Sequence, residues 1–172
     1  MTRPVFHTGG CQCGAVRYAL HAAPATPSIC HCRMCQKAFG AYYAPLASVM
    51  TEDLTWTRGE PKIFRSSSIV SRGFCAACGT PLTYEMDGER QVAISLGSLD
   101  DPAAVPPVIQ YGIEAMLPWV HELGRLPGVV TEADMPDGAL DRLVSHQHPD
   151  HDTAAWPPTD GFAGGSDEGT QR

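Results

Sequence analysis

Hydrophobic and polar side chains alternate along several short stretches of this chain, which is the pattern of half-buried β-strands. Val16, Tyr18 and Leu20 alternate with Arg17 and Ala19. Because successive side chains of a strand point to opposite faces of a sheet, this stretch should place one face against a core. Frequent glycines and prolines separate such stretches. We therefore expect a mainly β fold made of short strands joined by turns.

The clearest pair of strands is a predicted hairpin over residues 80–99, TPLTYEMDGERQVAISLGSL. Val92 and Ile94 in its second half alternate with Gln91 and smaller residues. Asp87-Gly88 in its middle predicts a type I′ turn. Three other stretches have strand-like composition, and they are Ala41–Val49, Leu54–Trp56 and Lys62–Arg65.

Helical patterns are few and short. Met34–Phe39 should form one or two turns that end at Gly40, and Asp100 should cap a short turn within Ser98–Ala104. Leucine and valine at helical spacing predict a short helix over Asp137–Ser145 that packs against the body.

The composition shifts near residue 149, beyond which the chain is rich in Pro, Gly and Asp and has little to bury. We therefore expect three parts. They are a zinc-binding domain over residues 1–130, a short C-terminal extension with a helical pattern over 131–148, and a disordered tail over 149–172.

Charge and hydropathy exclude two classes of partner. The 172 residues carry a formal charge of −7 and no basic run, which argues against a nucleic-acid groove. The apolar runs are too short to span a bilayer, and the N-terminal residues lack the apolar core of a signal peptide. We therefore expect a cytoplasmic protein, in which clustered cysteines indicate metal ligands rather than disulfides.

The seven cysteines fall into three groups, Cys11-x-Cys13, Cys30-x-Cys32-x-x-Cys35 and Cys75-x-x-Cys78. Gly14 and Gly79 follow the second cysteine of the first and the third group, where a glycine lets backbone amides turn toward the sulfurs. These two groups are natural partners. We predict that they form a closed structural zinc site, with ligands Cys11, Cys13, Cys75 and Cys78.

The middle group stands alone. Cys30, Cys32 and Cys35 supply three thiolates, and three protein ligands plus an exchangeable one is the pattern of a catalytic zinc. The alternative is a structural site that a histidine closes. His31 lies between two ligands and should point away from them in an extended strand. The other candidates for the fourth ligand are His7, His21 and His121.

Four segments together resemble the glutathione-dependent formaldehyde-activating (GFA) enzyme family, which includes the centromere protein V group. They are GGCQCGAVRY, CHCRMCQKAFGA, SRGFCAACGTPLTY and ISLGSLDDP, and the resemblance extends over residues 6 to 130. It implies an Mss4-like β-tent fold and two zinc ions per chain. It also implies the same sorting of ligands, with the reactive zinc on Cys30, Cys32 and Cys35.

The resemblance further implies a carbon–sulfur lyase, or thiol–aldehyde adduct synthase, similar to an S-(hydroxymethyl)glutathione synthase. A zinc-activated small thiol such as glutathione would add to formaldehyde or a similar small aldehyde. The family often carries a histidine-isoleucine step where this chain has Gln110 and Tyr111, a departure that leaves the substrate open. Lys37 and Arg72 lie close in sequence to the cysteines and are candidate hydrogen-bond donors, and neither is assigned a catalytic role.

Two other functions are compatible with a zinc protein of this size. One is a non-catalytic binding scaffold, and the other is a thiol-sensing zinc module that releases its metal on oxidation. A pure scaffold has no use for a vacant ligand position, so an open three-cysteine site favours the enzyme.

A second metal motif occurs near the C-terminus. Residues 146–151 have the H-x-H-x-D-H pattern of metallo-β-lactamase-type hydrolases. In that fold the motif follows a buried strand and further ligands come much later, whereas here a short helical pattern precedes it and few residues follow. We therefore do not expect a hydrolase site there.

Overall fold

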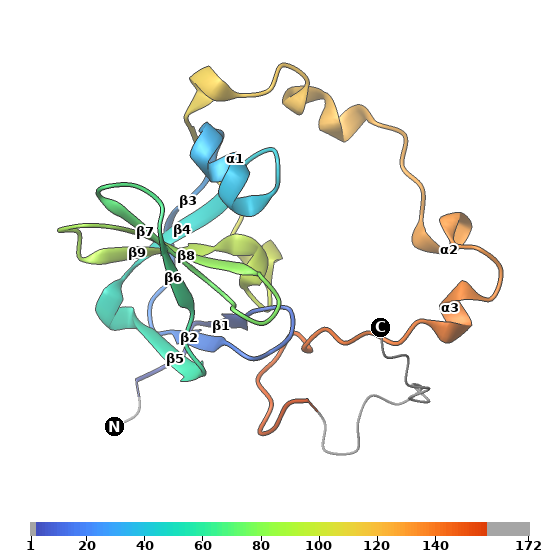
Figure 1. The fold of residues 1–172 in the computed structure, drawn as a ribbon, viewed down its shortest axis with the longest axis horizontal. Helices are drawn as coiled ribbons and strands as arrows, with labels where there is room; N and C mark the ends of the chain where they lie inside the picture. Colours follow the sequence, from blue (N-terminus) through green and yellow to red (C-terminus); the bar gives the residue numbers. More distant parts are fainter. Residues whose placement is uncertain (1–2, 158–172) are drawn as a thin grey trace.

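The computed structural model describes residues 3–157, and its strands form two sheets (Figure 1). The smaller sheet has three antiparallel strands in the order β1-β2-β5. Their bounds are His7–Gly10 for β1, Arg17–Leu20 for β2 and Leu54–Arg58 for β5. None of the helices within the described range is long and apolar enough to cross a membrane.

The larger sheet has seven strands in the order β10-β3-β4-β9-β8-β7-β6. Its strands are β3 (Ala25–Cys30), β4 (Ala44–Met50), β6 (Lys62–Arg65), β7 (Val70–Phe74), β8 (Pro81–Met86), β9 (Gln91–Ser95) and β10 (Ile109–Tyr111). The edge strand β10 pairs with β3 in parallel, and the other neighbours are antiparallel. The prediction of a mainly β fold with few short helices is confirmed.

Alternating apolar side chains of both sheets form the main core. Tyr18 and Leu20 of β2 are fully buried, as is Leu82 of β8, and Ile94 of β9 is 1% exposed. The ring of Tyr18 meets Trp56 of β5 edge to face, with centroids 5.9 Å apart. Burial of the apolar surface of these side chains makes the main favourable contribution to the free energy that holds the two sheets together.

The helices are short. Helix α1 (Arg33–Phe39) ends at Gly40, whose φ of 59° is the left-handed conformation that a C-terminal glycine cap adopts. The prediction of a short helix that stops at this glycine is confirmed. The other helical segments are η1 (Thr51–Asp53), η2 (Leu96–Ser98), η3 (Pro102–Ala104), η4 (Ile113–Ala115), η5 (Val120–Arg125), α2 (Thr131–Asp134) and α3 (Ala139–Arg142).

The hairpin of β8 and β9 forms, but its turn differs from the prediction. Glu85 pairs with Val92, so the connection runs over residues 87–90 rather than Asp87-Gly88 alone. Gly88 has a φ of 82°, whereas Asp87 is not among the described non-glycine residues with positive φ. A type I′ turn requires positive φ at both central positions. The longer connection over residues 87–90 does not need positive φ at both Asp87 and Gly88.

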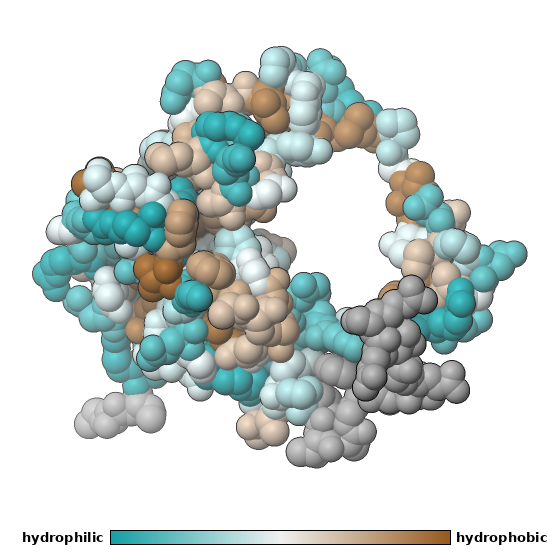
Figure 2. Space-filling view, viewed as in Figure 1, coloured by the Kyte–Doolittle hydropathy of each residue, from teal (hydrophilic) through white to brown (hydrophobic). Residues whose placement is uncertain are grey.

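The segment after β10 leaves the body in a wide arc (yellow to orange in Figure 1) and returns beside β1 and β2. Figure 2 shows open space between this arc and the body. The helix predicted over Asp137–Ser145 is reduced to α3, and its Leu140 and Leu143 are 40% and 62% exposed. The prediction that this helix packs against the body is wrong, because the arc holds α3 away from either sheet.

Residues 149–157 do not fit the description of a disordered tail, because they contact the turn that carries the first cysteine pair. Trp156 Nε1 donates to the Cys13 carbonyl oxygen at 2.9 Å, and His148, which directly precedes these residues, donates its backbone amide to the Gln12 carbonyl oxygen at 2.7 Å. Composition alone did not reveal these specific partners. Residues 158–172, also assigned to that tail, lie outside the described residues.

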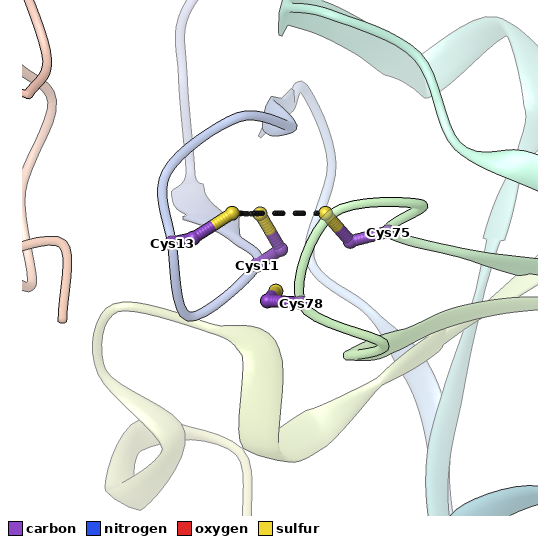
Figure 3. Close-up of side chains that lie close together, drawn as sticks. All are labelled: Cys11, Cys13, Cys75 and Cys78. Carbon is purple, nitrogen blue, oxygen red and sulfur yellow. Dashed lines mark hydrogen bonds between the residues drawn. The ribbon is translucent and has the colours of Figure 1, made fainter. Parts of the chain in front are cut away.

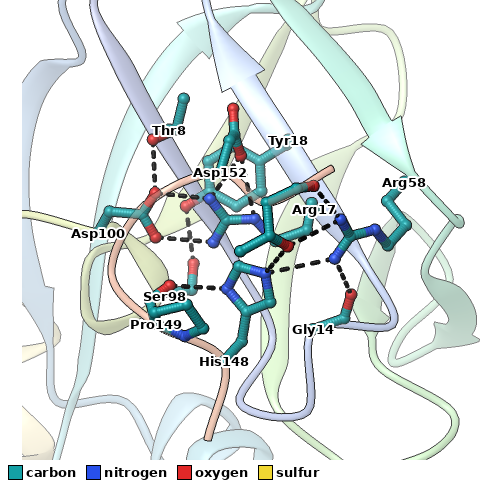
Figure 4. Close-up of polar contacts among 11 residues, drawn as sticks. Thr8, Gly14, Arg17, Tyr18, Arg58, Ser98, Asp100, His148, Pro149 and Asp152 are labelled. Atoms are coloured by element: carbon teal, nitrogen blue, oxygen red, sulfur yellow. Dashed lines mark hydrogen bonds and ion pairs between the residues drawn. The ribbon is translucent and has the colours of Figure 1, made fainter. Parts of the chain in front are cut away.

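A buried ion pair fixes this C-terminal segment on the smaller sheet (Figure 4). Arg17 is 3% exposed and donates to both carboxylate oxygens of Asp100, at 2.7 and 2.6 Å, and to Asp152 at 2.6 Å. Burial raises the pKa of Asp100, but hydrogen bonds from Arg17 and Thr8 outweigh it and hold that pKa below its ordinary value. The pair joins β2, the loop after β9 and the C-terminal segment.

Asp100→Asn should therefore lower the free energy of unfolding by about 3 kcal/mol at pH 7, because it leaves a buried guanidinium short of one counter-charge. The matched control is Asp87→Asn, which breaks the exposed pair with Arg65 and should change the stability little. Urea unfolding of the zinc-loaded protein measures both.

The same pair predicts a pH dependence. A carboxylate with a depressed folded pKa stabilises the protein above its unfolded pKa of about 3.9, and this stabilisation is lost as the pH falls through the lower folded pKa. The stability difference between wild type and Asp100→Asn should be constant from pH 7 to 5 and should shrink below about pH 4. An equal difference at pH 7 and pH 3 would contradict this role.

Candidate functional site

Four cysteines from two loops point toward a common centre (Figure 3). Cys11 and Cys13 follow β1, and Cys75 and Cys78 lie between β7 and β8. Each pair sits in a tight turn. The amide of Gly14 donates to the Cys11 carbonyl oxygen at 3.0 Å, and the amide of Gly79 donates to that of Cys75 at 2.9 Å. Both glycines have positive φ, at 71° and 78°, as the predicted turns require.

The sulfur positions fit a tetrahedral ion. Cys11 Sγ lies 3.6 Å from Cys13 Sγ, which lies 3.8 Å from Cys75 Sγ, and the four sulfurs lie within 4.8 Å of one another. Zinc–sulfur bonds of about 2.3 Å in a tetrahedron place the sulfurs about 3.8 Å apart. All four cysteines are free thiols. We call them the four-cysteine group.

The thiols of this group differ in their environment. Burial raises the pKa of Cys11 to about 12. Burial also raises the pKa of Cys78, but hydrogen bonds from the side chain and backbone of Thr80 outweigh it and lower that pKa to about 6. A buried thiol such as Cys11 gives up its proton at neutral pH when a cation replaces it. The group therefore has the character of a cation site.

Cys30, Cys32 and Cys35 form a second group, whose sulfurs also lie within 4.8 Å of one another. Cys30 ends β3, Cys32 is the N-cap of α1, and Cys35 lies in the first turn of that helix. The amide of Cys35 donates to Cys32 Sγ at 3.4 Å. We call this the three-cysteine group. The structure thus brings together each of the seven predicted ligands with its predicted partners.

Two thiols of the three-cysteine group differ in acidity. Burial raises the pKa of Cys32, but hydrogen bonds from backbone amides and neighbouring thiols outweigh it and lower that pKa below its ordinary value. Burial raises the pKa of Cys35 to about 12, although the guanidinium of Arg72 acts in the opposite direction. The helix N-terminus therefore holds one sulfur whose thiolate is stabilised by hydrogen bonds and one whose thiolate is opposed by burial.

Within residues 3–157, no histidine or carboxylate joins the three sulfurs as a fourth ligand. His31 is fully buried, but its Nε2 lies 2.9 Å from Gln110 Oε1 and its ring packs edge to face on Tyr43. His21 contacts the Pro4 carbonyl oxygen and Thr55. The histidine-closed alternative therefore finds no support in the geometry.

His7 and His121 likewise lie outside the group, and His121 is paired with Glu122 on the surface.

Polar contacts hold the segment after β10 against the three-cysteine group. Gln36 is 3% exposed, and its Nε2 donates to the carbonyl oxygens of His31 at 2.8 Å and Ala115 at 3.1 Å. A Cβ at Gly112 would lie 2.8 Å from the backbone nitrogen of Cys32, so glycine permits this close approach. Neither contact with the segment after β10 is evident from the sequence, since Ala115 is 79 residues from Gln36 and Gly112 is equally remote from the first cysteines of the group.

The two candidate donors are placed differently. Arg72 is 7% exposed, and its Nη2 donates to Cys35 Sγ at 3.3 Å. Lys37 is exposed on α1, and both side chains line a cavity of about 550 Å³ between α1 and strands β6 and β7. Tyr84 was not predicted, although it pairs across the strands with Arg72, whose guanidinium lies over its ring.

The C-terminal histidine motif does not form a third metal group in the described part of the chain. His148 is 4% exposed, its Nδ1 donates to the Pro149 carbonyl oxygen, and its Nε2 accepts from Thr153 and Arg58 (Figure 4). Because both ring nitrogens have protein partners, this histidine is a structural residue of the C-terminal segment.

Comparison with known proteins identifies the family. A crystal structure of a Rhodobacter sphaeroides protein is similar to this chain, with a TM-score of 0.49 and 22% sequence identity over 60% of this chain and 98% of that one. The model of the glutathione-dependent formaldehyde-activating enzyme family matches residues 6–114, which include all seven cysteines. The chain belongs to the glutathione-dependent formaldehyde-activating enzyme family.

Proposed function

We propose that this protein is a zinc-dependent thiol–aldehyde adduct synthase, and in reverse a carbon–sulfur lyase, with glutathione or a similar small thiol and formaldehyde or a similar small aldehyde as substrates. The observation that carries the proposal is the difference between the two cysteine groups. One gathers four sulfurs and the other gathers three, with no further protein ligand in the described range. Family membership supports the same class of reaction.

In this proposal each group has one task. Cys11, Cys13, Cys75 and Cys78 hold a structural zinc, so that binding free energy becomes folding free energy. Cys30, Cys32 and Cys35 hold a second zinc whose remaining position is exchangeable. Zinc bound there would lower the pKa of an incoming thiol and keep its sulfur nucleophilic at neutral pH. The thiolate ligands require a reducing compartment, so we propose a cytoplasmic location.

The proposed reaction balances without a redox step. The thiolate sulfur donates its electron pair to the carbonyl carbon and a C–S bond forms. The π electrons of the carbonyl move to its oxygen, and the proton that the thiol gave up ends on that oxygen. The product is an S-hydroxyalkyl thioether, R–S–CH₂OH for formaldehyde. In the reverse direction the C–S bond breaks and the aldehyde leaves.

The protein side chains supply position and charge for this step. The N-terminus of α1 directs backbone amides at Cys32 and stabilises its thiolate. Arg72, on β7, donates to Cys35 Sγ. The cavity beside Arg72 offers a route by which small molecules can approach.

Cys32→Ser should distinguish the role of the three-cysteine group from that of the four-cysteine group. Serine is a good N-cap, so α1 should persist, while the three-cysteine group loses a ligand. We expect about one zinc per chain instead of two, a melting temperature within a few degrees of wild type, and loss of activity. Cys78→Ser, the matched change in the other group, should instead lower the melting temperature strongly. Two retained zinc ions in Cys32→Ser would contradict this assignment.

The catalytic claim is tested by exchange spectroscopy at equilibrium. With ¹³C-formaldehyde and glutathione, the zinc-loaded protein should speed the exchange between formaldehyde hydrate and S-hydroxymethylglutathione above the uncatalysed rate. Cys32→Ser should not. Equal exchange rates with and without the wild-type protein, for glutathione and for cysteine alike, would favour the scaffold or thiol-sensing alternatives.

A further inference from the structure

Arg72 lies on β7 with its side chain buried beside the three-cysteine group. Its Nη2 lies 3.3 Å from Cys35 Sγ and its Nε lies 3.3 Å from Ser66 Oγ. The guanidinium carbon lies 5.0 Å from the centre of the Tyr84 ring. These contacts fix the plane of the guanidinium, so its charge is held at one place next to a sulfur.

No carboxylate within residues 3–157 forms an ion pair with this guanidinium. The contrast is Arg17, equally buried, which has two carboxylate partners. A buried arginine without a counter-charge is costly, and buried charges are therefore paired. The sulfur of Cys35 is the acidic group that Arg72 touches. Once a bound cation has displaced the thiol protons, the three-cysteine group would be the counter-charge of Arg72.

The charges of the group explain why such a partner is needed. Three thiolates on Zn²⁺ have a net charge of −1, and a visiting thiolate would bring it to −2. Two like charges in a poorly solvated site repel strongly. A fixed guanidinium makes the net charge of the site less negative by one in either state. It therefore lowers the cost of taking up an anion.

Two further observations support an anion at this place. Nη1 of Arg72 is buried and has no hydrogen-bond partner among the described residues, so one N–H donor pair is left for an acceptor. The cavity that Arg72 lines is also lined by Arg33 and Lys37, and no acidic residue of the range 3–157 lines it. A cleft lined by one sign of charge attracts ligands of the opposite sign.

We propose that Arg72 is a positioning residue whose guanidinium is the counter-charge of the three-cysteine group and lets that group accept an anionic ligand. The proposal rests on the proposed function in one respect, since it takes the ligand to be a thiolate. Arg72 acts through the sulfur of Cys35 and through the charge of the site.

The first test measures thiol binding apart from turnover. Cobalt-substituted protein is titrated with 2-mercaptoethanol, and the thiolate-to-cobalt charge-transfer absorption gives Kd. Arg72→Gln should raise Kd at least about tenfold, whereas Arg72→Lys, which keeps the charge, should stay within about threefold of wild type. The matched control is Arg90→Gln, which removes an exposed arginine outside that cavity and should also stay within about threefold.

Unchanged thiol affinity in Arg72→Gln with both metals bound would overturn the proposal. Equal weakening in Arg72→Lys and Arg72→Gln would also overturn it, because the effect would then follow hydrogen-bond geometry rather than charge. Ser66→Ala removes the Nε contact and keeps the charge, so its Kd should match that of wild type. If Arg72→Gln does not fold, Arg72→Met replaces it and fills the same space without charge.

The second test does not depend on thiol binding. A chelator should remove zinc from the wild-type protein in a fast phase from the three-cysteine group and a slow phase from the four-cysteine group. Arg72→Gln should speed the fast phase at least about tenfold and leave the slow phase unchanged. If the wild-type protein binds no thiol, the proposed function is refuted, but the role of Arg72 in the charge of the site is not. Identical fast phases in wild type and Arg72→Gln would refute the role of Arg72.

Discussion

The constraint on which the rest of the structure depends is the meeting of four sulfurs from two loops that are far apart in sequence. One pair follows β1 in the smaller sheet, and the other lies between β7 and β8 in the larger sheet. Cys11 and Cys75 are buried within the main core. An ion held there would join the two sheets at the point where their side chains pack.

The three-cysteine group differs from it in both construction and surroundings. Its three sulfurs come from one short segment at the junction of β3 and α1, so its assembly depends on local structure. The residues that surround it come from distant parts of the sequence. Gln110 faces His31, Gly112 approaches Cys32, and Arg72 contacts Cys35. The local segment thus provides the three sulfurs. The rest of the fold provides the charged and polar groups around them and limits their exposure to solvent.

This division also explains what the sequence could predict. Cysteine spacing and the following glycines are local signals, so the two groups in which the structure gathers the seven cysteines could be predicted. The helix that stops at Gly40 was predicted for the same reason. Contacts between distant segments were not predictable from one sequence. The burial of His148, for example, depends on Arg58, which is 90 residues away along the chain, and on Gln12.

The central claim is that one zinc is saturated by the chain while the other has an exchangeable ligand. Zinc X-ray absorption of the fully loaded protein tests it most directly. The account predicts about 3.5 sulfur ligands per zinc, because seven cysteines serve two ions, and a rise to about 4 when excess glutathione is added. A sulfur count that glutathione does not change, or a single zinc per chain, would contradict it.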